Sequence, residues 1–446
     1  MSLSTNYKNI FAVAFPIMLG SAAQQIIGLS DSVFLYHYSE LAFASIALVS
    51  VFYLIIASIG YGFSKGGQII IARRVGDGNT DKISESFYTL LLFELSLAFV
   101  MFLLMRYGSE WFLKFFIKSP RIYEQSLLYI RMRAFGVFLS YGGISIVALY
   151  TGVSRTTFII VDSVILLVSN LILNYLLIFG KFGFPEMGIE GAALASVLAE
   201  LIGFSVFILY MLLGGSYKRW GLDKFPKLSI SALKSILNLS SPIVVQSIIS
   251  LGSYFIFFSM IEVYLGEKAL AISNLIRNVS FILTIPSWGF SSAINTFVSQ
   301  LIGMRKRMGV MPIIYKTANL NLLTTMVMTI PVILFPTITL YPLFGGDDMS
   351  LIIESKSVLY VLFFILILAS LGMIYFNGLS GTGASKHGMK IQAFVSIVYL
   401  LYIYLVLKYG GGSLELAWTA EIVYWVLVGG LSLKYLYSNR WYGNKF

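Results

Sequence analysis

The chain has 446 residues, of which 58% are hydrophobic and only 11% are charged, and its net charge is +11. Soluble domains carry about 25% charged residues, so this composition excludes a water-soluble globular protein and indicates an integral membrane protein. The chain contains no cysteine, which excludes disulfides, thiolate catalysis and cysteine metal sites.

Long apolar runs recur along the whole chain and predict about twelve transmembrane helices. The expected ranges are 9–36, 41–73, 83–108, 122–150, 157–180, 187–213, 240–265, 268–302, 313–337, 351–378, 389–407 and 414–435. The first run is not expected to be a cleavable signal peptide, because it is long and lacks a small-residue cleavage site. The one long connection, 214–239, predicts a cytoplasmic linker between an N-terminal lobe, 1–213, and a C-terminal lobe, 240–446.

The two halves resemble each other in sequence. YGFSKGGQIIIARRVG (61–76) aligns without a gap with WGFSSAINTFVSQLIG (288–303), and AEL (199–201) aligns with AEI (420–422). An even number of helices in each half predicts two parallel repeats, which place a cavity between two bundles and suit alternating access. We therefore expect an all-α membrane protein whose two pseudo-symmetric six-helix lobes form a V with a central cavity.

The positive charge is concentrated in alternate loops. Basic residues gather at 73–74 and 305–307, whereas the intervening loops contain acidic residues such as Glu110 and Glu267. This alternation follows the positive-inside rule and predicts that the N- and C-termini both lie in the cytoplasm. The basic composition therefore indicates orientation in a membrane, and nucleic acid is not an expected partner.

One charged residue, Asp31, interrupts the first apolar run. A carboxylate in the middle of a membrane costs roughly 2.5–3.5 kcal/mol on insertion scales, and such residues are functional by default. Helix rise places four polar residues roughly 7–15 Å below the outer surface, namely Asp31, Asn170, Asn174 and Ser196. An anion, two amide oxygens and a hydroxyl at one depth could dehydrate a sodium ion. With a proton on the carboxylate, the same residues could form a proton site.

These residues also have structural alternatives. Asn170 and Asn174 share one helix face at i, i+4 and could be hydrogen-bonding groups between helices. Ser196 lies in the small-residue run GAALAS and could serve close packing. Gln24 shares a helix face with Asp31 at i, i+7 and is expected to line the same lobe. For Asp31 we favour function, because an unpaired buried carboxylate is a poor structural choice.

The passage NLILNYLLIFGKFGFPEMGIEGAALASVLAE (170–200) resembles the signature between helices five and six of the multidrug and toxic compound extrusion (MATE) family. GLSDSVF (28–34), Pro16 in helix one and the turn GTGASK (381–386) add to a resemblance that covers essentially the whole chain. The family belongs to the multidrug/oligosaccharidyl-lipid/polysaccharide flippase superfamily. The resemblance implies export of drugs, often organic cations, in exchange for H⁺ or Na⁺. It also implies a cation site in the N-terminal lobe, formed by the positions that match Asp31, Asn170, Asn174 and Ser196.

The C-terminal half departs from this pattern. The repeat alignment puts Leu400 and Tyr404 where the N-terminal half has its two asparagines, so we expect the cation site in the N-terminal lobe only. Glu200 and Glu421 occupy equivalent positions near the inner ends of their helices, which favours a structural role for both. Pro16, about four turns before the membrane carboxylate, is a plausible bend point for helix one.

The sequence therefore predicts a secondary antiporter of a prokaryotic cytoplasmic membrane that exports amphipathic, cationic drugs or toxins. The alternative is a flippase for a lipid-linked saccharide or another anionic lipid. Such a protein needs a cationic cavity, and Lys65 and Arg277 keep this alternative open. Gln24, Gln246 and Arg277 are the candidate residues of the substrate cavity.

Other classes of function are not expected. The two histidines lie in loops, and the chain has neither clustered metal-ligand spacing nor a GxSxG motif, which argues against an enzyme. We expect no cofactor, and no metal beyond a coupling Na⁺ at Asp31, Asn170 and Asn174. The expected partners are the small-molecule substrate and the lipid bilayer, and the expected state is a monomer.

Overall fold

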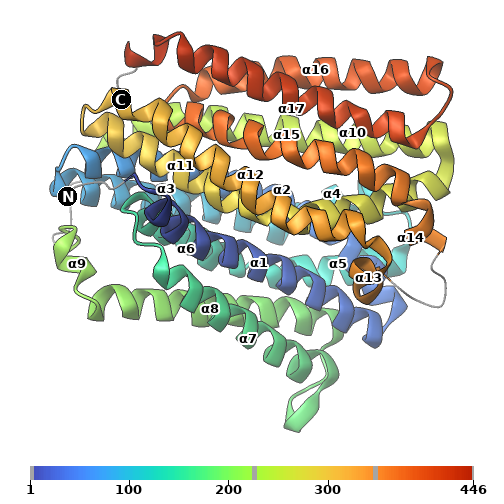
Figure 1. Ribbon diagram of the computed structural model, residues 1–446. Helices are drawn as coiled ribbons and strands as arrows, with labels where there is room; N and C mark the ends of the chain where they lie inside the picture. Colours follow the sequence, from blue (N-terminus) through green and yellow to red (C-terminus); the bar gives the residue numbers. More distant parts are fainter. Residues whose placement is uncertain (1–4, 224–228, 345–349, 444–446) are drawn as a thin grey trace. The chain divides into compact units, whose positions relative to one another are not determined.

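The computed structural model describes residues 5–223, 229–344 and 350–443, and within these ranges it contains helices and no strand (Figure 1). Part of the predicted linker, residues 224–228, lies outside the described residues. In the first half of the chain the helices are α1 (Tyr7–Tyr38), α2 (Glu40–Gly76), α3 (Thr80–Leu103), α4 (Ser109–Phe116), α5 (Pro120–Arg133), α6 (Gly136–Gly152), α7 (Thr157–Phe179), α8 (Gly188–Leu213) and α9 (Ser216–Arg219).

In the second half the helices are α10 (Ile230–Leu283), α11 (Ile285–Gly303), α12 (Val310–Leu334), α13 (Pro336–Phe344), α14 (Ser350–Glu354), α15 (Lys356–Gly381), α16 (Ser385–Tyr409) and α17 (Leu414–Tyr437). A π-helical turn at Leu104–Gly108 joins α3 to α4. Short 3₁₀ turns occur at Lys181–Gly183, Arg307–Gly309 and Arg440–Gly443.

The number of spans agrees with a multi-pass membrane protein. Among the described residues, ten helices are long and apolar enough to cross a membrane, or up to eleven if α5 and α6 form one span that is bent by 50°. Helix α10 holds the expected span 240–265 and the first part of the expected span 268–302, and its backbone breaks between them at Gly266 with φ 83° and ψ −178°. Only glycine readily adopts this conformation, so the two predicted helices 240–265 and 268–302 meet at this residue.

Two predicted helices are divided near their middle in the structure. The expected helix 122–150 is interrupted between α5 and α6, so the prediction of one continuous helix is wrong there. The expected helix 268–302 is divided at Thr284, where α10 ends and α11 begins with Pro286 in its first turn. Proline lacks a backbone N–H and is tolerated at the start of a helix, which favours a new helix at this point.

Contacts divide the chain into two compact units, Leu19–Ser241 and Met1–Met18 with Pro242–Phe446. Helix α1 thus begins in the second of these units and ends in the first. Its early residues group with the C-terminal half because Ile10 and Val13 belong to the same hydrophobic core as Phe290. The predicted N-terminal lobe started instead at residue 1.

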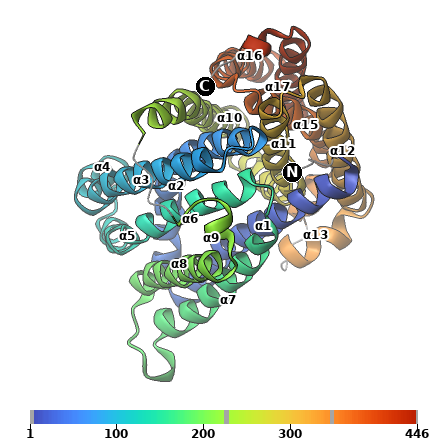
Figure 2. The ribbon, with the colours of Figure 1, turned by 90° about the vertical axis from the view of Figure 1, so that its left-hand side faces the viewer.

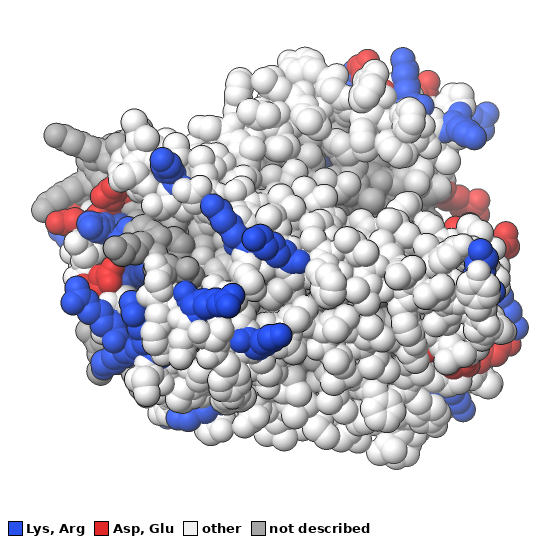
Figure 3. All heavy atoms as spheres, turned by 90° about the horizontal axis from the view of Figure 1, so that it is seen from above, with Lys and Arg blue, Asp and Glu red and all other residues white. Residues whose placement is uncertain are grey.

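Helices that are close in sequence also pack together within each unit. In Figures 1 and 2, α7 lies beside α8 in one unit, and α17 lies beside α15 and α16 in the other. On the face in Figure 3, charged side chains of both signs lie toward both ends, with more Lys and Arg on the left, and a wide part of that face carries no charged side chain. An apolar surface of this kind matches a chain that lies in lipid.

Candidate functional site

The structure brings together the four polar residues that helix rise placed at one depth. Asp31 lies on α1, Asn170 and Asn174 lie one turn apart on α7, and Ser196 lies on α8. All four belong to the unit Leu19–Ser241. The asparagines are 0% exposed, the aspartate is 7% exposed and the serine is 6% exposed. These side chains therefore form a buried polar cluster, which we call the Asp31 cluster.

Hydrogen bonds connect the cluster across three helices. Asn174 donates from Nδ2 to Oδ1 of Asp31 at 2.5 Å, and Ser196 donates from Oγ to Oδ2 at 3.2 Å. Asn174 Nδ2 also donates to Oδ1 of Asn170 at 3.1 Å. Asn170 in turn donates from its own Nδ2 to Oγ of Ser196 at 3.3 Å. Both oxygens of the carboxylate thus accept hydrogen bonds from neutral donors. No ion pair of Asp31 occurs in the described part of the chain.

The cluster contains an acceptor that lacks a donor. The side-chain oxygen Oδ1 of Asn174 is buried and has no hydrogen-bond partner among the described residues. A buried acceptor of this kind is available to a water molecule, an ion or another ligand. A cation beside Asp31 would be coordinated by this oxygen, by the carboxylate and by Oδ1 of Asn170. Oxygen ligands of this kind suit Na⁺, and the same acceptors could receive a proton carried by the carboxyl group.

A glycine sets the distance between the two helices that carry the asparagines and the serine. A Cβ atom on Gly191 of α8 would lie 2.6 Å from the backbone oxygen of Leu177 on α7. Backbone atoms cannot move aside as a flexible side chain can, so only glycine allows this close approach. The short separation lets Asn170 and Ser196 reach each other. The segment between α7 and α8 is also held by a hydrogen bond of 2.9 Å from the backbone N–H of Met187 to the backbone oxygen of Leu177.

The predicted substrate-cavity residues lie in different places. Gln24 is exposed and lines a small cavity of about 100 Å³ in the unit Leu19–Ser241. Gln246 on α10 is buried and donates from Nε2 to the backbone oxygen of Ser385 at 2.9 Å. Arg277, also on α10, has its guanidinium 5.3 Å from the ring centroid of Phe258. Neither described cavity contains all three of these candidates.

Two other residues that the sequence singled out have clear positions. Pro16 is buried inside α1, which runs as one helix from Tyr7 to Tyr38. Lys65 is half-buried on α2 in the unit Leu19–Ser241. The bend at the proline and the place of the lysine in a cavity stay predictions.

The structure also gives Glu200 a partner that the sequence did not identify. Arg133, at the end of α5, donates from Nη1 to Oε2 at 2.8 Å and from Nη2 to Oε1 at 2.5 Å. The guanidinium also lies 4.2 Å from the ring centroid of Tyr53. The two-pronged ion pair agrees with a structural role for Glu200. The pairing could not be read from the sequence, because the two residues are 67 positions apart and lie on different helices.

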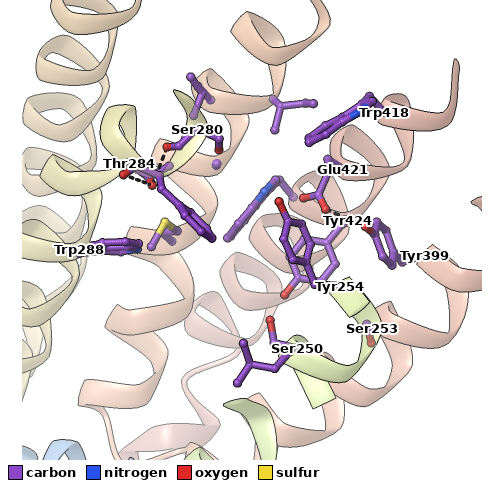
Figure 4. A pocket seen from close by; sticks show the side chains of 17 residues that line it. Ser250, Ser253, Tyr254, Ser280, Thr284, Trp288, Tyr399, Trp418, Glu421 and Tyr424 are labelled. Atoms are coloured by element: carbon purple, nitrogen blue, oxygen red, sulfur yellow. Dashed lines mark hydrogen bonds between the residues drawn. The ribbon is translucent and has the colours of Figure 1, made fainter. Parts of the chain in front are cut away.

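A larger cavity lies in the other unit and was not foreseen. It has a volume of about 370 Å³, and Glu421 lies in its wall (Figure 4). Oε1 of this glutamate accepts a hydrogen bond from the Tyr399 hydroxyl at 2.8 Å. The sequence analysis singled out Glu421 only as the repeat equivalent of Glu200, and the lack of charged residues in α15 after Lys356 was the further signal that its surroundings differ.

Comparisons with known proteins identify the class to which this fold belongs. A sequence model of the MatE family matches residues 16–176 and 242–405, so the chain belongs to the MATE family of transporters. It is similar to the probable multidrug resistance protein NorM of Thermotoga maritima. The two are 27% identical over 443 residues, which cover 97% of this chain and 93% of that protein.

The fold resembles solved structures over almost its whole length. One is an outward-facing multidrug resistance MATE family transporter of the MOP superfamily, with a TM-score of 0.87 and 18% identity over 97% of this chain and 96% of that one. Another is a MOP superfamily transporter from Pyrococcus furiosus, described as having a binding pocket of reverse polarity. Its TM-score is 0.86 with 18% identity, covering 97% of this chain and 95% of the other.

These findings confirm three predictions from the sequence. The chain is an all-helical, multi-pass membrane protein, it has the MATE fold, and its family consists of transporters rather than enzymes. Because the sequence identity to the solved structures is low, the similarity to them shows the fold alone. The role of each residue in the Asp31 cluster therefore has to be argued from the contacts of this chain.

Proposed function

We propose that this chain is a secondary antiporter that exports drugs and other toxic amphipathic cations in exchange for H⁺ or Na⁺ bound at the Asp31 cluster. The observation that carries the proposal is a carboxylate buried in a membrane-spanning helix whose hydrogen-bond partners are all neutral. The names of multidrug resistance relatives such as NorM of Thermotoga maritima support the substrate class. MATE transporters as a family use ion coupling.

The cluster suggests how ion binding could change helix packing. The bonds from Asn174 and Ser196 to Asp31 hold α7 and α8 against α1. An ion at the carboxylate would take up lone pairs that these donors occupy, so the three helices would pack differently with and without the ion. A ligand shifts a conformational equilibrium only through such differences in affinity. The drug and the ion could then bind in alternation, with Pro16 of α1 as the proposed bend point.

We place the protein in the cytoplasmic membrane of a prokaryote with both termini in the cytoplasm and propose that it works as a monomer. The alternation of basic and acidic loops supports this orientation. The bacterial relatives support the location. Its partners are then the transported drug and the surrounding lipid.

A flippase for an anionic lipid is the second candidate. The observation in its favour is Arg277, whose Nε is buried and has no hydrogen-bond partner among the described residues. A phosphate oxygen could accept from this group. We prefer the antiporter because a buried carboxylate is the main feature of the Asp31 cluster, and a carboxylate repels an anionic headgroup.

The test is uptake of a fluorescent organic cation into inverted membrane vesicles that contain the protein. Uptake is measured for the wild type and for Asp31→Asn under a proton gradient and then under a sodium gradient. We expect uptake to need one of the gradients and to be lost in the variant. Glu94→Gln is the matched control, because it removes another buried carboxyl group of the same unit, outside the Asp31 cluster.

The outcomes separate the candidates. Uptake by Asp31→Asn equal to that of the wild type would show that ion coupling does not need this carboxylate. A wild type that moves no organic cation, but does move a lipid-linked saccharide in a vesicle assay, would establish the flippase instead. The gradient that drives uptake identifies the coupling ion.

A further inference from the structure

The cavity of about 370 Å³ is confined to the unit that contains the C-terminal half of the chain. Its described lining comes from α10, α11, α15, α16 and α17, with Thr284 between α10 and α11. Cavities that bind small molecules measure about 300–1,000 Å³ and are mostly apolar with a few polar groups. The volume therefore suits a small organic molecule.

The wall of this cavity is rich in aromatic rings. They belong to Tyr254, Phe281, Trp288, Tyr399, Trp418, Tyr424 and Trp425. In Figure 4 the Glu421 carboxylate lies among the labelled rings of Tyr399, Tyr424 and Tyr254. Aromatic faces carry a negative quadrupole and attract cations, and cages of such rings bind quaternary ammonium groups. A carboxylate among these rings adds a full negative charge.

Glu421 is the only charged side chain among the described residues that line the cavity. Its hydrogen-bond partners are the hydroxyl of Tyr399 and the side chain of Trp425, both neutral, and within the described ranges it forms no ion pair. The nearby hydroxyls of Ser253 and Thr284 donate to the backbone of their own segments, at 2.7 Å and 2.8 Å. A negative charge on this carboxyl group would thus have no compensating cation inside a membrane-spanning helix, which is costly.

The internal repeat shows that the lack of an ion-pair partner for Glu421 is a specific difference between the halves. Glu200 in AEL (199–201) and Glu421 in AEI (420–422) occupy equivalent positions. In the first half Arg133, from the helix pair α5 and α6, neutralises its glutamate. That helix pair forms the fourth expected span of the first half, 122–150, and α15 lies in the fourth of the second half, 351–378, but has no charged residue after Lys356. Both glutamates line a cavity, but only the first has an arginine partner, and the cavity of the second is the larger and more aromatic one.

Arg277 does not take the place of the missing arginine. It is not among the described residues that line the cavity, and its guanidinium lies over the ring of Phe258. The sequence alone favoured a structural role for Glu421, by analogy with Glu200. The different surroundings of the two glutamates argue against extending that role to the second one.

We propose that this cavity binds an organic monocation, such as a quaternary ammonium or pyridinium compound, with its charge against Glu421 and its apolar body among the aromatic rings. The inference rests on the proposed function, because it assigns a place and a chemical class to the exported drug. A cation in this position supplies the charge that the carboxylate lacks. An anion of the same size would meet the carboxylate and the negative faces of the rings, and it would be excluded.

The test measures equilibrium binding to the full chain in lipid nanodiscs, with no gradient present. The probes are radiolabelled 1-methyl-4-phenylpyridinium, which carries a permanent positive charge, and benzenesulfonate, an aromatic anion. We expect saturable binding of the cation and none of the anion. Glu421→Gln preserves the shape and the acceptor for Tyr399 and should weaken cation binding about tenfold or more. Glu415→Gln, on the same helix but outside the cavity, should leave it unchanged.

A second variant keeps the charge and reduces the space. Ala369 of α15 lines the cavity and is buried, so Ala369→Leu should narrow it and also weaken binding. This variant carries the test if Glu421→Gln is not monodisperse after purification. The proposal is overturned if the wild type does not bind the cation saturably, if it prefers benzenesulfonate, or if the folded variants bind the cation within about twofold of the wild type.

The results also separate this inference from the proposed function. Loss of gradient-driven uptake in Asp31→Asn, together with unchanged cation binding in Glu421→Gln, would support the antiporter and overturn the cavity proposal. Weakened binding in Glu421→Gln, together with normal uptake by Asp31→Asn, would support the cavity and overturn the coupling role of the Asp31 cluster.

Discussion

The ion pair between Arg133 and Glu200 permits a quantitative prediction about stability. The guanidinium makes two hydrogen bonds to the carboxylate, at 2.8 Å and 2.5 Å, and it also lies over the ring of Tyr53. The side chains are only 7% and 17% exposed. The perturbation is Arg133→Met, which keeps a long apolar side chain and removes the charge.

The expected loss follows from what remains after the substitution. Glu200 would keep a buried charge with no cation beside it, and breaking a buried pair from one side costs about 3–5 kcal/mol. Because the glutamate keeps some contact with solvent, we expect the lower part of this range, about 3–4 kcal/mol. Arg133→Met with Glu200→Gln removes both charges and should recover at least ~2 kcal/mol of that loss.

The assay is the free energy of unfolding from titration with sodium dodecyl sulfate in mixed micelles, followed by circular dichroism. Lys268→Gln serves as the control, because it breaks the exposed pair with Glu354 and should change the free energy by less than about 1 kcal/mol. The reasoning is refuted if Arg133→Met costs no more than this control. It is also refuted if the double variant is no more stable than Arg133→Met alone.

Three further predictions concern single residues. In Gly191→Ala the new Cβ would lie 2.6 Å from the backbone oxygen of Leu177, so the same unfolding assay should show a loss of about 1–3 kcal/mol. Gly143→Ala, which meets nothing within 4 Å, is the matched control and should cause no loss. Asn174→Leu removes a hydrogen bond to a charged group, so the coupling-ion concentration for half-maximal uptake should rise about tenfold or more; no change would mean that the asparagine only joins helices. Gly266→Ala adds a side chain at φ 83° in open space, so a lower melting temperature in detergent would reflect backbone strain alone, of about 1–3 kcal/mol. An unchanged melting temperature would show that alanine fits the bend at this position without backbone strain.

Much of the Asp31 cluster could be predicted from the sequence because helix geometry is regular. A rise of about 1.5 Å per residue gives the depth of each residue in a straight span, and the i, i+4 spacing puts Asn170 and Asn174 on one face. These rules apply inside a single helix. They were enough to place Asp31, the asparagines and Ser196 at one level of the membrane, where the structure joins them by hydrogen bonds.

The same rules could not identify contacts that depend on which helix faces meet. The pairing of Arg133 with Glu200 needs α5 to lie against α8, and a repeat alignment made Glu200 and Glu421 look equivalent. The interruption between α5 and α6 was also missed, because both pieces are apolar enough to read as one span.

The sequence by itself determined that the chain is a helical membrane protein built from two related halves, with a carboxyl group inside the span of helix one. Composition and helical periodicity depend only on neighbours along the chain. The tertiary structure alone decided that the start of α1 groups with the C-terminal unit and that Glu421 faces an aromatic cavity without a cation. Those features arise from packing between helices that are far apart in sequence, where the partner of a buried charge is set by the neighbouring helix and not by the local pattern.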